Sequence, residues 1–198
     1  MCDISSTAGE ERKTRTTMKN IETAKDCIAL LKSLRAVRQF RPDPIPEEVV
    51  QNLLEVARWS GSASNLQPWE LIVIRNRQTL QTLAKVEGYV GHLAGAPLSI
   101  VLVMAGDRGQ IEQETFDEGR LSERIMLAAA AYGVGSSVGW FKGKGVAEAK
   151  RMLGIPEQRL VRTAISLGYP DEEAQRNRPK PAQARKPLSQ IVHEERYS

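Results

Sequence analysis

Ser-Ala-Ser-Asn-Leu-Gln-Pro-Trp, residues 62–69, places polar side chains between a helix-like segment and a strand-like segment. Upstream, the segment after Pro46 has acidic residues in its first turn and apolar residues at helical spacing. Downstream, residues 70–74 predict a buried strand. Because connections held between regular elements often carry binding groups, we predict that this stretch contributes Ser62, Asn65 and Gln67 to a site. A turn in which these side chains only cap their own backbone is the alternative.

Two further segments carry a pattern that extends this one. Leu-Arg-Ala-Val-Arg-Gln-Phe-Arg-Pro-Asp-Pro-Ile occupies residues 34–45, and Ala-Arg-Lys-Pro-Leu occupies residues 184–188. In order and spacing, the three segments resemble the nitroreductase family of flavin enzymes. Members typically carry Arg-Arg-Ser-x-Arg-x-Phe, then a helix entry containing proline, then Ser-x-x-Asn-x-Gln-Pro-Trp. The resemblance covers roughly residues 28–197.

The resemblance implies a set of residues that bind flavin mononucleotide (FMN). The first segment and the C-terminal segment would hold the phosphate, for which the planar, always charged guanidinium of arginine is well suited; these residues are Arg35, Ala36, Val37, Arg38, Arg185 and Lys186. The resemblance assigns Ser62, Asn65 and Gln67 to the ribityl chain or ring, and Gly139 and Trp140 to the approach to the ring.

The chain departs from the family pattern at three places. Leu34 and Ala36 stand where many members have Arg and Ser, and the Pro-x-Glu-Gly motif of many members is missing. The glycine cluster at residues 133–139 follows a helix-like segment and lacks the spacing of a dinucleotide-binding loop. The alternative to a role beside the flavin ring is that this glycine cluster forms a helix C-cap followed by a strand.

The resemblance also implies the activity, which is reduction of an organic acceptor such as a nitro compound or quinone by NADH or NADPH. Hydride would pass through flavin N5 in a ping-pong scheme, and we assign no catalytic side chain. The alternatives are a family relative with dehalogenase or flavin-fragmenting chemistry, and a flavin-binding sensor or carrier without turnover. The family further implies a homodimer with flavin sites at the interface. Small residues at 125–131 and a Pro-rich tail that needs a surface to lie on support that implication.

Along the chain, residues 1–20 are expected to form a flexible leader and residues 21–198 a single domain, with an extended tail from about residue 170. The expected fold is α+β, with a mixed central sheet of four or five strands flanked by helices. The continuous apolar run at residues 98–104 predicts a central strand covered on both faces. Helices are predicted to begin near Ile21, Gln78, Asp117 and Val146, and a further strand to cover residues 160–167.

Composition limits the other classes of function. The net charge is +4, but the basic residues are dispersed and aromatic content is 5%, so nucleic-acid binding is not expected. No apolar run approaches the roughly 20 residues of a membrane span, and no secretory signal is visible, so we expect a cytoplasmic protein. Cys2 and Cys27 are too few for a metal cluster, and Cys27 is predicted to be buried. No metal site is expected, and surface or capping roles are predicted for His92 and His193.

Overall fold

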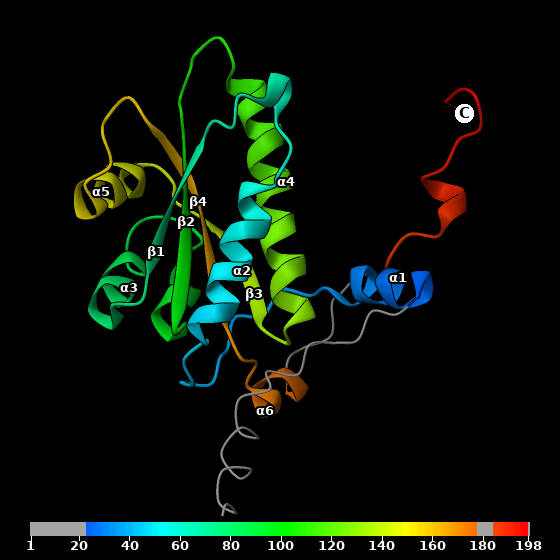
Figure 1. The fold of residues 1–198 in the computed structure, drawn as a ribbon, viewed down its shortest axis with the longest axis horizontal. Coiled ribbons are helices and arrows are strands. Elements are labelled where there is room, and N and C mark those ends of the chain that lie inside the picture. The colour runs from blue at the N-terminus through cyan, green and yellow to red at the C-terminus, as the bar shows by residue number, and fades with distance from the viewer. Residues whose placement is uncertain (1–22, 178–183, 198) are drawn as a thin grey trace, which may run out of the picture.

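The computed structural model describes residues 23–177 and 184–197, so Cys2 and the expected leader lie outside the described residues. Helices and strands alternate along much of the chain (Figure 1). The α-helices are α1 (Ala24–Ser33), α2 (Glu47–Arg58), α3 (Arg77–Leu83), α4 (Ile111–Ala131), α5 (Lys144–Leu153) and α6 (Glu172–Arg176). The strands are β1 (Trp69–Ile74), β2 (Leu98–Met104), β3 (Gly135–Trp140) and β4 (Leu160–Gly168). Three 3₁₀ turns are η1 (Ala63–Asn65), η2 (Gly91–Gly95) and η3 (Leu188–Gln190).

The sheet has four strands in the order β1-β2-β4-β3, and each neighbouring pair is antiparallel. The α+β class and the number of strands agree with the expectation, whereas the pairing differs from the mixed sheet. Parallel pairing occurs at an isolated bridge between Ala36 and Ser136. There the Val37 N–H donates to the Ser136 carbonyl at 2.7 Å, and the pairing does not extend into a strand.

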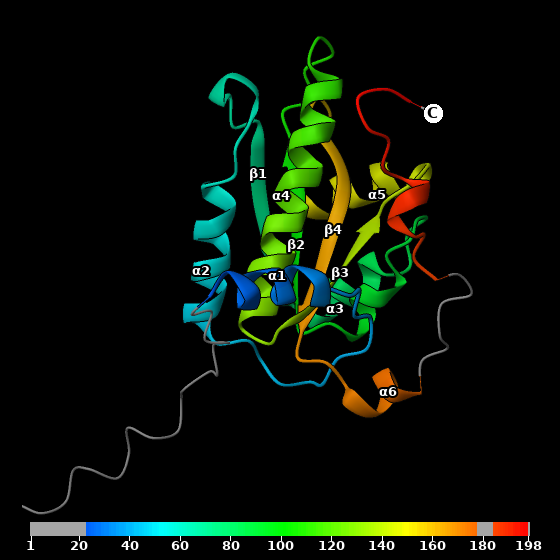
Figure 2. The same cartoon turned by 90° about the vertical axis from the view of Figure 1, so that its right-hand side faces the viewer.

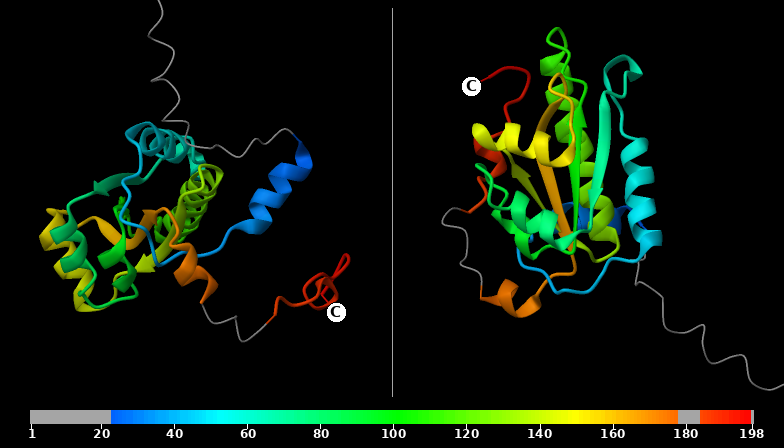
Figure 3. Two further views of the ribbon diagram at one scale, coloured as in Figure 1. Left: turned by 90° about the horizontal axis from the view of Figure 1, so that it is seen from below. Right: turned by 90° about the vertical axis from the view of Figure 1, so that its left-hand side faces the viewer.

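The core consists of two hydrophobic layers, one on each face of the sheet. Successive residues of β2 point to opposite faces, and all of them are buried, as the continuous apolar run predicts. Ile100 and Leu102 pack with α2 and α4, while Val101 and Val103 pack with α3, η2 and α5 (Figures 1 and 3). β1 was expected to be buried, but it is an edge strand in which only Ile74 is buried.

Three helices, α1, α4 and α6, depart from the expectation. α4 begins at Ile111, earlier than Asp117, because Glu112 and Glu114 supply the acidic first turn that favours a helix start. α1 has no buried residue and projects from the α4 side of the domain (Figure 1). The prediction of a buried Cys27 is therefore wrong, and its thiol is exposed. The short helix α6 interrupts the expected extended tail. Within residues 23–177 and 184–197, no helix has the length and apolar content to cross a membrane.

Candidate functional site

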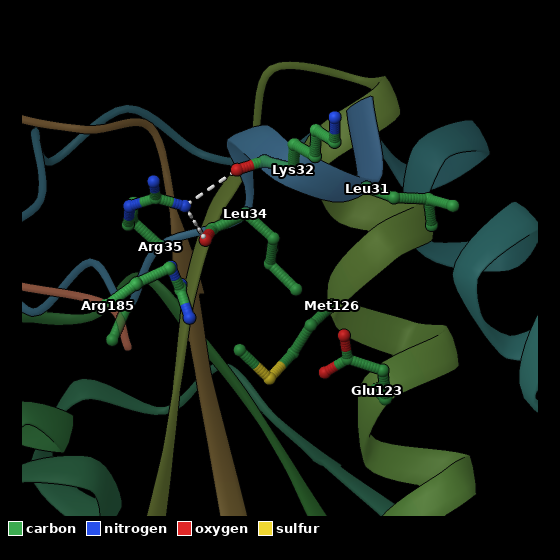
Figure 4. Close-up of a pocket in the computed structure, with 8 residues that line it drawn as sticks. Leu31, Lys32, Leu34, Arg35, Glu123, Met126 and Arg185 are labelled. Carbon is green, nitrogen blue, oxygen red and sulfur yellow. Dashed lines mark hydrogen bonds between the residues drawn. The ribbon is translucent and has the colours of Figure 1, made fainter. Parts of the chain in front are cut away.

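A cavity of about 810 Å³ lies between α1, the chain that follows it, and α4. It brings together Arg35 and Arg185, which are 150 positions apart in the sequence (Figure 4). We call it the Arg185 cavity; its lining residues are Leu31, Lys32, Leu34, Arg35, Ala36, Glu123, Met126 and Arg185. Two of the three segments singled out in the sequence therefore meet at one place.

The guanidinium of Arg35 is fixed at the C-terminal end of α1. Its Nη1 donates to the Lys32 carbonyl at 2.8 Å and to the Leu34 carbonyl at 2.7 Å (Figure 4). These carbonyls belong to the last turn of a helix and its cap, where backbone acceptors lack helical partners and the helix dipole is negative. Arg35 thus combines a cap of α1 with a positive charge on the cavity wall.

The charges of the Arg185 cavity favour an anion. Lys32, Arg35 and Arg185 are basic residues of its lining, and Glu123 on α4 is the acidic one. Leu34 and Met126 supply apolar surface between them. Leu34 stands where the family pattern has its first arginine, and the cations of the lining are Lys32, Arg35 and Arg185.

The residues that follow Arg35 have separate roles. Ala36 lines the cavity, whereas Val37 is buried and packs on β3. A Cβ at Gly135 would lie 2.8 Å from the Val37 side chain, so the close approach of this segment to β3 requires glycine there. Arg38 is exposed, and it lies close enough to His92 for its charge to act on the imidazole.

A second cavity of about 340 Å³ continues from the first along α4 and shares Glu123 and Met126 with it. We call it the Trp140 cavity; its further lining residues are Thr115, Glu118, Gly119, Ser122, Val138, Trp140, Arg162 and Thr163. Val138 and Trp140 are two positions apart on β3 and therefore face the same side. Trp140 is largely exposed, so its ring is open to a ligand.

Gly139 faces the opposite side of β3, toward η2. A Cβ there would lie 2.6 Å from the Tyr89 carbonyl oxygen and 2.7 Å from His92 Nε2. The packing of η2 on β3 thus explains this glycine. His92 is not a surface or capping residue as predicted, because it is half-buried and its Nδ1 lies 2.7 Å from Ser166 Oγ. Burial, and then the charge of Arg38, hold the pKa of His92 below its ordinary value.

The Ser62–Gln67 loop is held in a strained conformation. Ser64, Asn65 and Gln67 have φ of 48°, 55° and 49°, in the left-handed region that residues other than glycine rarely adopt. Ser62 Oγ accepts from the Gln67 N–H at 2.8 Å, so Ser62 does cap its own turn. Asp117 on α4 accepts from the Ala63 N–H at 3.1 Å and ties the loop to the helix. The side chains of Asn65 and Gln67 stay exposed.

One chain does not bring this loop to the Arg185 cavity. The loop contacts the N-terminal part of α4 through Asp117, whereas Glu123 and Met126 of the cavity lining lie farther along the helix. Figure 2 shows α1, which borders the cavity, beside the end of α4 that is distant from the loop. Lys186 is exposed beside Arg185. In the described ranges, no three His, Cys, Asp or Glu side chains gather as a metal site.

Sequence reasoning missed the carboxylates that organise α4. Asp117 served only as the expected start of a helix, and Glu118 and its partner Arg162 were not singled out. Glu118 and Arg162 are separated by 44 residues, and a single acid on a helix is typically solvated, so the sequence carries no local signal that Glu118 is buried and paired.

Comparison with known proteins places the chain in a family. The model of the nitroreductase family matches residues 31–88. A protein assigned as an NADH dehydrogenase/NAD(P)H nitroreductase in Archaeoglobus fulgidus is 30% identical over 152 residues, covering 75% of this chain and 87% of the relative. The 5,6-dimethylbenzimidazole synthase of Rhodospirillum rubrum is 30% identical over 179 residues, covering 73% of this chain and 82% of the relative. The structure of an FMN-dependent nitroreductase from Clostridium difficile R20291 is similar with a TM-score of 0.70 at 22% identity, covering 86% of this chain and 99% of the other.

These similarities, together with the α+β fold and the cavity that Arg35 and Arg185 both line, define the class of protein as an oxidoreductase. The chain belongs to the nitroreductase family, and it is an enzyme. The resemblance stated from the three sequence segments is thereby confirmed.

The attachment of the loop to α4 yields a first prediction. Replacing Asp117 with alanine leaves the partly buried Ala63 N–H without an acceptor, which costs a part of the about 1–3 kcal/mol that a fully buried donor would lose. We expect a lower free energy of unfolding and faster hydrogen exchange at the amide of Ala63. Denaturant titration and exchange mass spectrometry measure the two quantities. Asp117→Asn keeps an acceptor oxygen and is the matched control; equal exchange in both variants would contradict the role of Asp117.

Proposed function

We propose that this protein binds FMN non-covalently and uses NADH or NADPH to reduce an organic acceptor, such as a nitro compound or a quinone. The observation that carries the proposal is the joining of Arg35 and Arg185 in one cavity, which continues along α4 to the exposed ring of Trp140. Relatives named as NAD(P)H nitroreductase and NADPH-flavin oxidoreductase support it.

The two adjoining cavities fit the two ends of FMN. Phosphate is an anion that arginine binds well, and the Arg185 cavity supplies Lys32, Arg35 and Arg185. A flat aromatic ring needs apolar surface, and the Trp140 cavity supplies Val138 and Trp140. From Met126 to Glu118 the helix rises by about 12 Å, which separates a phosphate end from a ring end.

The chain's share of the reaction is to bind, orient and shield. When bound, FMN supplies the hydride chemistry, from the nicotinamide to the acceptor through flavin N5, and an enzyme of this kind needs few reactive side chains. Met126 and Val138 exclude water from the ring face, and Arg35, fixed at the end of α1, sets the position of the phosphate. No side chain is assigned as acid or base.

We further propose that the enzyme is a homodimer and that the loop of one protomer completes the site of the other. Asn65 and Gln67 are exposed in a strained loop that the same chain holds away from its own Arg185 cavity. The C-terminal segment and α1 leave apolar side chains uncovered: Leu188 is 73% exposed, Ile191 56% and Ile28 48%. A second copy of the chain would cover these residues and bring a loop to each cavity.

A single anaerobic spectrum tests the main proposal. The purified protein should be yellow with oxidised-flavin bands, and NADH or NADPH should bleach it until a nitro compound or quinone restores the colour. A colourless protein that does not take up added FMN would overturn flavin binding. A yellow protein that neither nucleotide reduces would instead support a sensor or carrier.

The Rhodospirillum rubrum relative favours a second candidate, a flavin-fragmenting activity. The 5,6-dimethylbenzimidazole of its name contains the same dimethylbenzene unit as the flavin ring. Chromatography of the reduced-flavin reaction after admission of oxygen would detect that product. Its formation would replace acceptor reduction as the main activity, whereas intact flavin would exclude this candidate.

Loss of either arginine of the Arg185 cavity should weaken FMN binding. A charge-assisted hydrogen bond is worth about 1.5–3 kcal/mol, so Arg35→Ala and Arg185→Ala should each lower FMN affinity tenfold or more. Flavin fluorescence after desalting measures this loss. Arg77→Ala, which removes an exposed arginine from α3, is the control. Retention equal to wild type in both variants would remove the phosphate role from this cavity.

If the site is shared between protomers, dimer dissociation and flavin loss should occur together. Light scattering across a dilution series, with flavin fluorescence read in parallel, should show one common concentration range for both transitions. Ile191→Asp should shift both transitions to higher protein concentration, while Lys85→Asp, at an exposed position just after the C-cap of α3, should shift neither. A monomer that holds FMN at every concentration would contradict the shared site.

A further inference from the structure

Two exposed aromatic side chains lie opposite each other at the end of β3, beside the Trp140 cavity. Gly88 and Phe141 form an antiparallel bridge, so Tyr89 lies directly across from Trp140 on the same face. The Tyr89 N–H donates to the Trp140 carbonyl at 2.7 Å. The two side chains are 67% and 57% exposed, and the function described so far uses only Trp140.

The backbone around these rings is closely packed. A Cβ at Gly88 would lie 2.2 Å from the Trp140 carbonyl oxygen, so this approach requires glycine. The Lys142 N–H donates to the Glu87 carbonyl at 2.9 Å and extends the pairing by one step. Because side chains alternate along an extended segment, Trp140 and Lys142 point to the same side.

The ammonium group of Lys142 is held over the ring of Tyr89. Its Nζ lies 4.9 Å from the centre of that ring, which is the geometry of a cation–π contact. Glu87, the acid in the paired segment, directs its Oε2 to the backbone N–H of Lys144 at 2.9 Å. Within the part of the chain that the structure describes, no carboxylate forms an ion pair with Lys142. The aromatic contact restrains a flexible side chain while its charge stays available to a ligand.

A restrained ammonium beside exposed aromatic surface suits one kind of ligand. Lysine is a point charge that suits a single carboxylate, whereas the lining of the Arg185 cavity offers three basic residues to a phosphate. Tyr89 and Trp140 supply ring surface next to this charge. A flat aromatic compound with one carboxylate uses both features.

We propose that Lys142 selects acceptors that carry a carboxylate on an aromatic ring. Tyr89 is a positioning residue, because its ring holds the Lys142 ammonium beside Trp140. This inference rests on the proposed function, in which the acceptor is reduced at the ring end of the flavin site, next to Trp140. It adds a substrate class to that function, namely aromatic acids with a reducible nitro or quinone group.

A matched pair of ligands tests the role of charge. 4-Nitrobenzoate and 4-nitrobenzamide have the same ring and nearly the same size, but only the first is an anion. The full-length protein, as purified and without a reductant, is titrated with each by ligand-observed NMR. Wild type should bind the acid about fivefold more tightly than the amide, and added salt should reduce the difference, because an exposed charge is screened. Equal binding of acid and amide would overturn the proposal.

Substitution of Lys142 tests which residue supplies the charge. Lys142→Gln keeps a polar side chain, and it should weaken binding of 4-nitrobenzoate about fivefold while binding of 4-nitrobenzamide stays unchanged. Lys144→Gln is the matched control, because Lys144 is also exposed and only its backbone N–H contacts Glu87. An equal loss in the two variants would indicate a diffuse positive field and contradict the proposal.

Substitution of Tyr89 tests the positioning role. Tyr89→Phe keeps the ring face and should bind 4-nitrobenzoate as wild type does. Tyr89→Leu removes the cation–π contact and should lose part of the preference for the acid over the amide. A preference equal to that of wild type in both variants would remove the positioning role from Tyr89.

The nucleotide phosphate is the competing ligand for this cation. If Lys142→Gln weakens binding of NADP+ more than binding of NAD+ and spares 4-nitrobenzoate, the charge serves the nucleotide and the acceptor assignment is overturned. The titrations need no electron transfer. Failure of NADH to bleach the flavin would therefore count against the proposed function, while the binding of the two nitro compounds still decides the role of Lys142.

Discussion

The arrangement depends on three buried carboxylates on the first half of α4. Glu114 accepts from the N–H groups of Gly106 and Asp107 at 2.8 and 3.0 Å, Asp117 accepts from that of Ala63, and Glu118 pairs with Arg162. Each carboxylate fixes a different segment, namely the turn after β2, the Ser62–Gln67 loop and β4. A buried carboxylate needs donors, so each contact is obligatory once α4 has packed on the sheet. The helix thereby sets the positions of both the strained loop and the cavity wall.

Close packing against β3 explains two glycines that resemble parts of a nucleotide loop. Gly135 makes room for Val37, and Gly139 makes room for Tyr89 and His92. The first contact draws the segment of Arg35 along the start of β3, and the second turns Trp140 toward α4. The glycines therefore act by bringing backbone segments together, and the side chains beside them form the cavities.

The candidate site residues of the chain lie in two places. Cations from α1 and the C-terminal segment gather at the far half of α4, whereas the polar loop sits at its near half. Uncovered apolar side chains on α1 and on the C-terminal segment accompany this division. The homodimer proposed above would account for both features, since one protomer's loop would then lie over its partner's cations.

The sequence by itself determined the α+β class, the central position of β2 and the pattern of motifs, because hydrophobic periodicity and the chemistry of short segments are local properties. It also supplied Arg35 and Arg185 through the family resemblance. Tertiary structure decided the antiparallel pairing, the exposure of Cys27, the half-burial of His92 and the Glu118–Arg162 pair. Each of these depends on which segments distant in sequence come into contact. An ion pair between residues 44 positions apart leaves no trace in local composition, and the packing of α4 on β4 creates it.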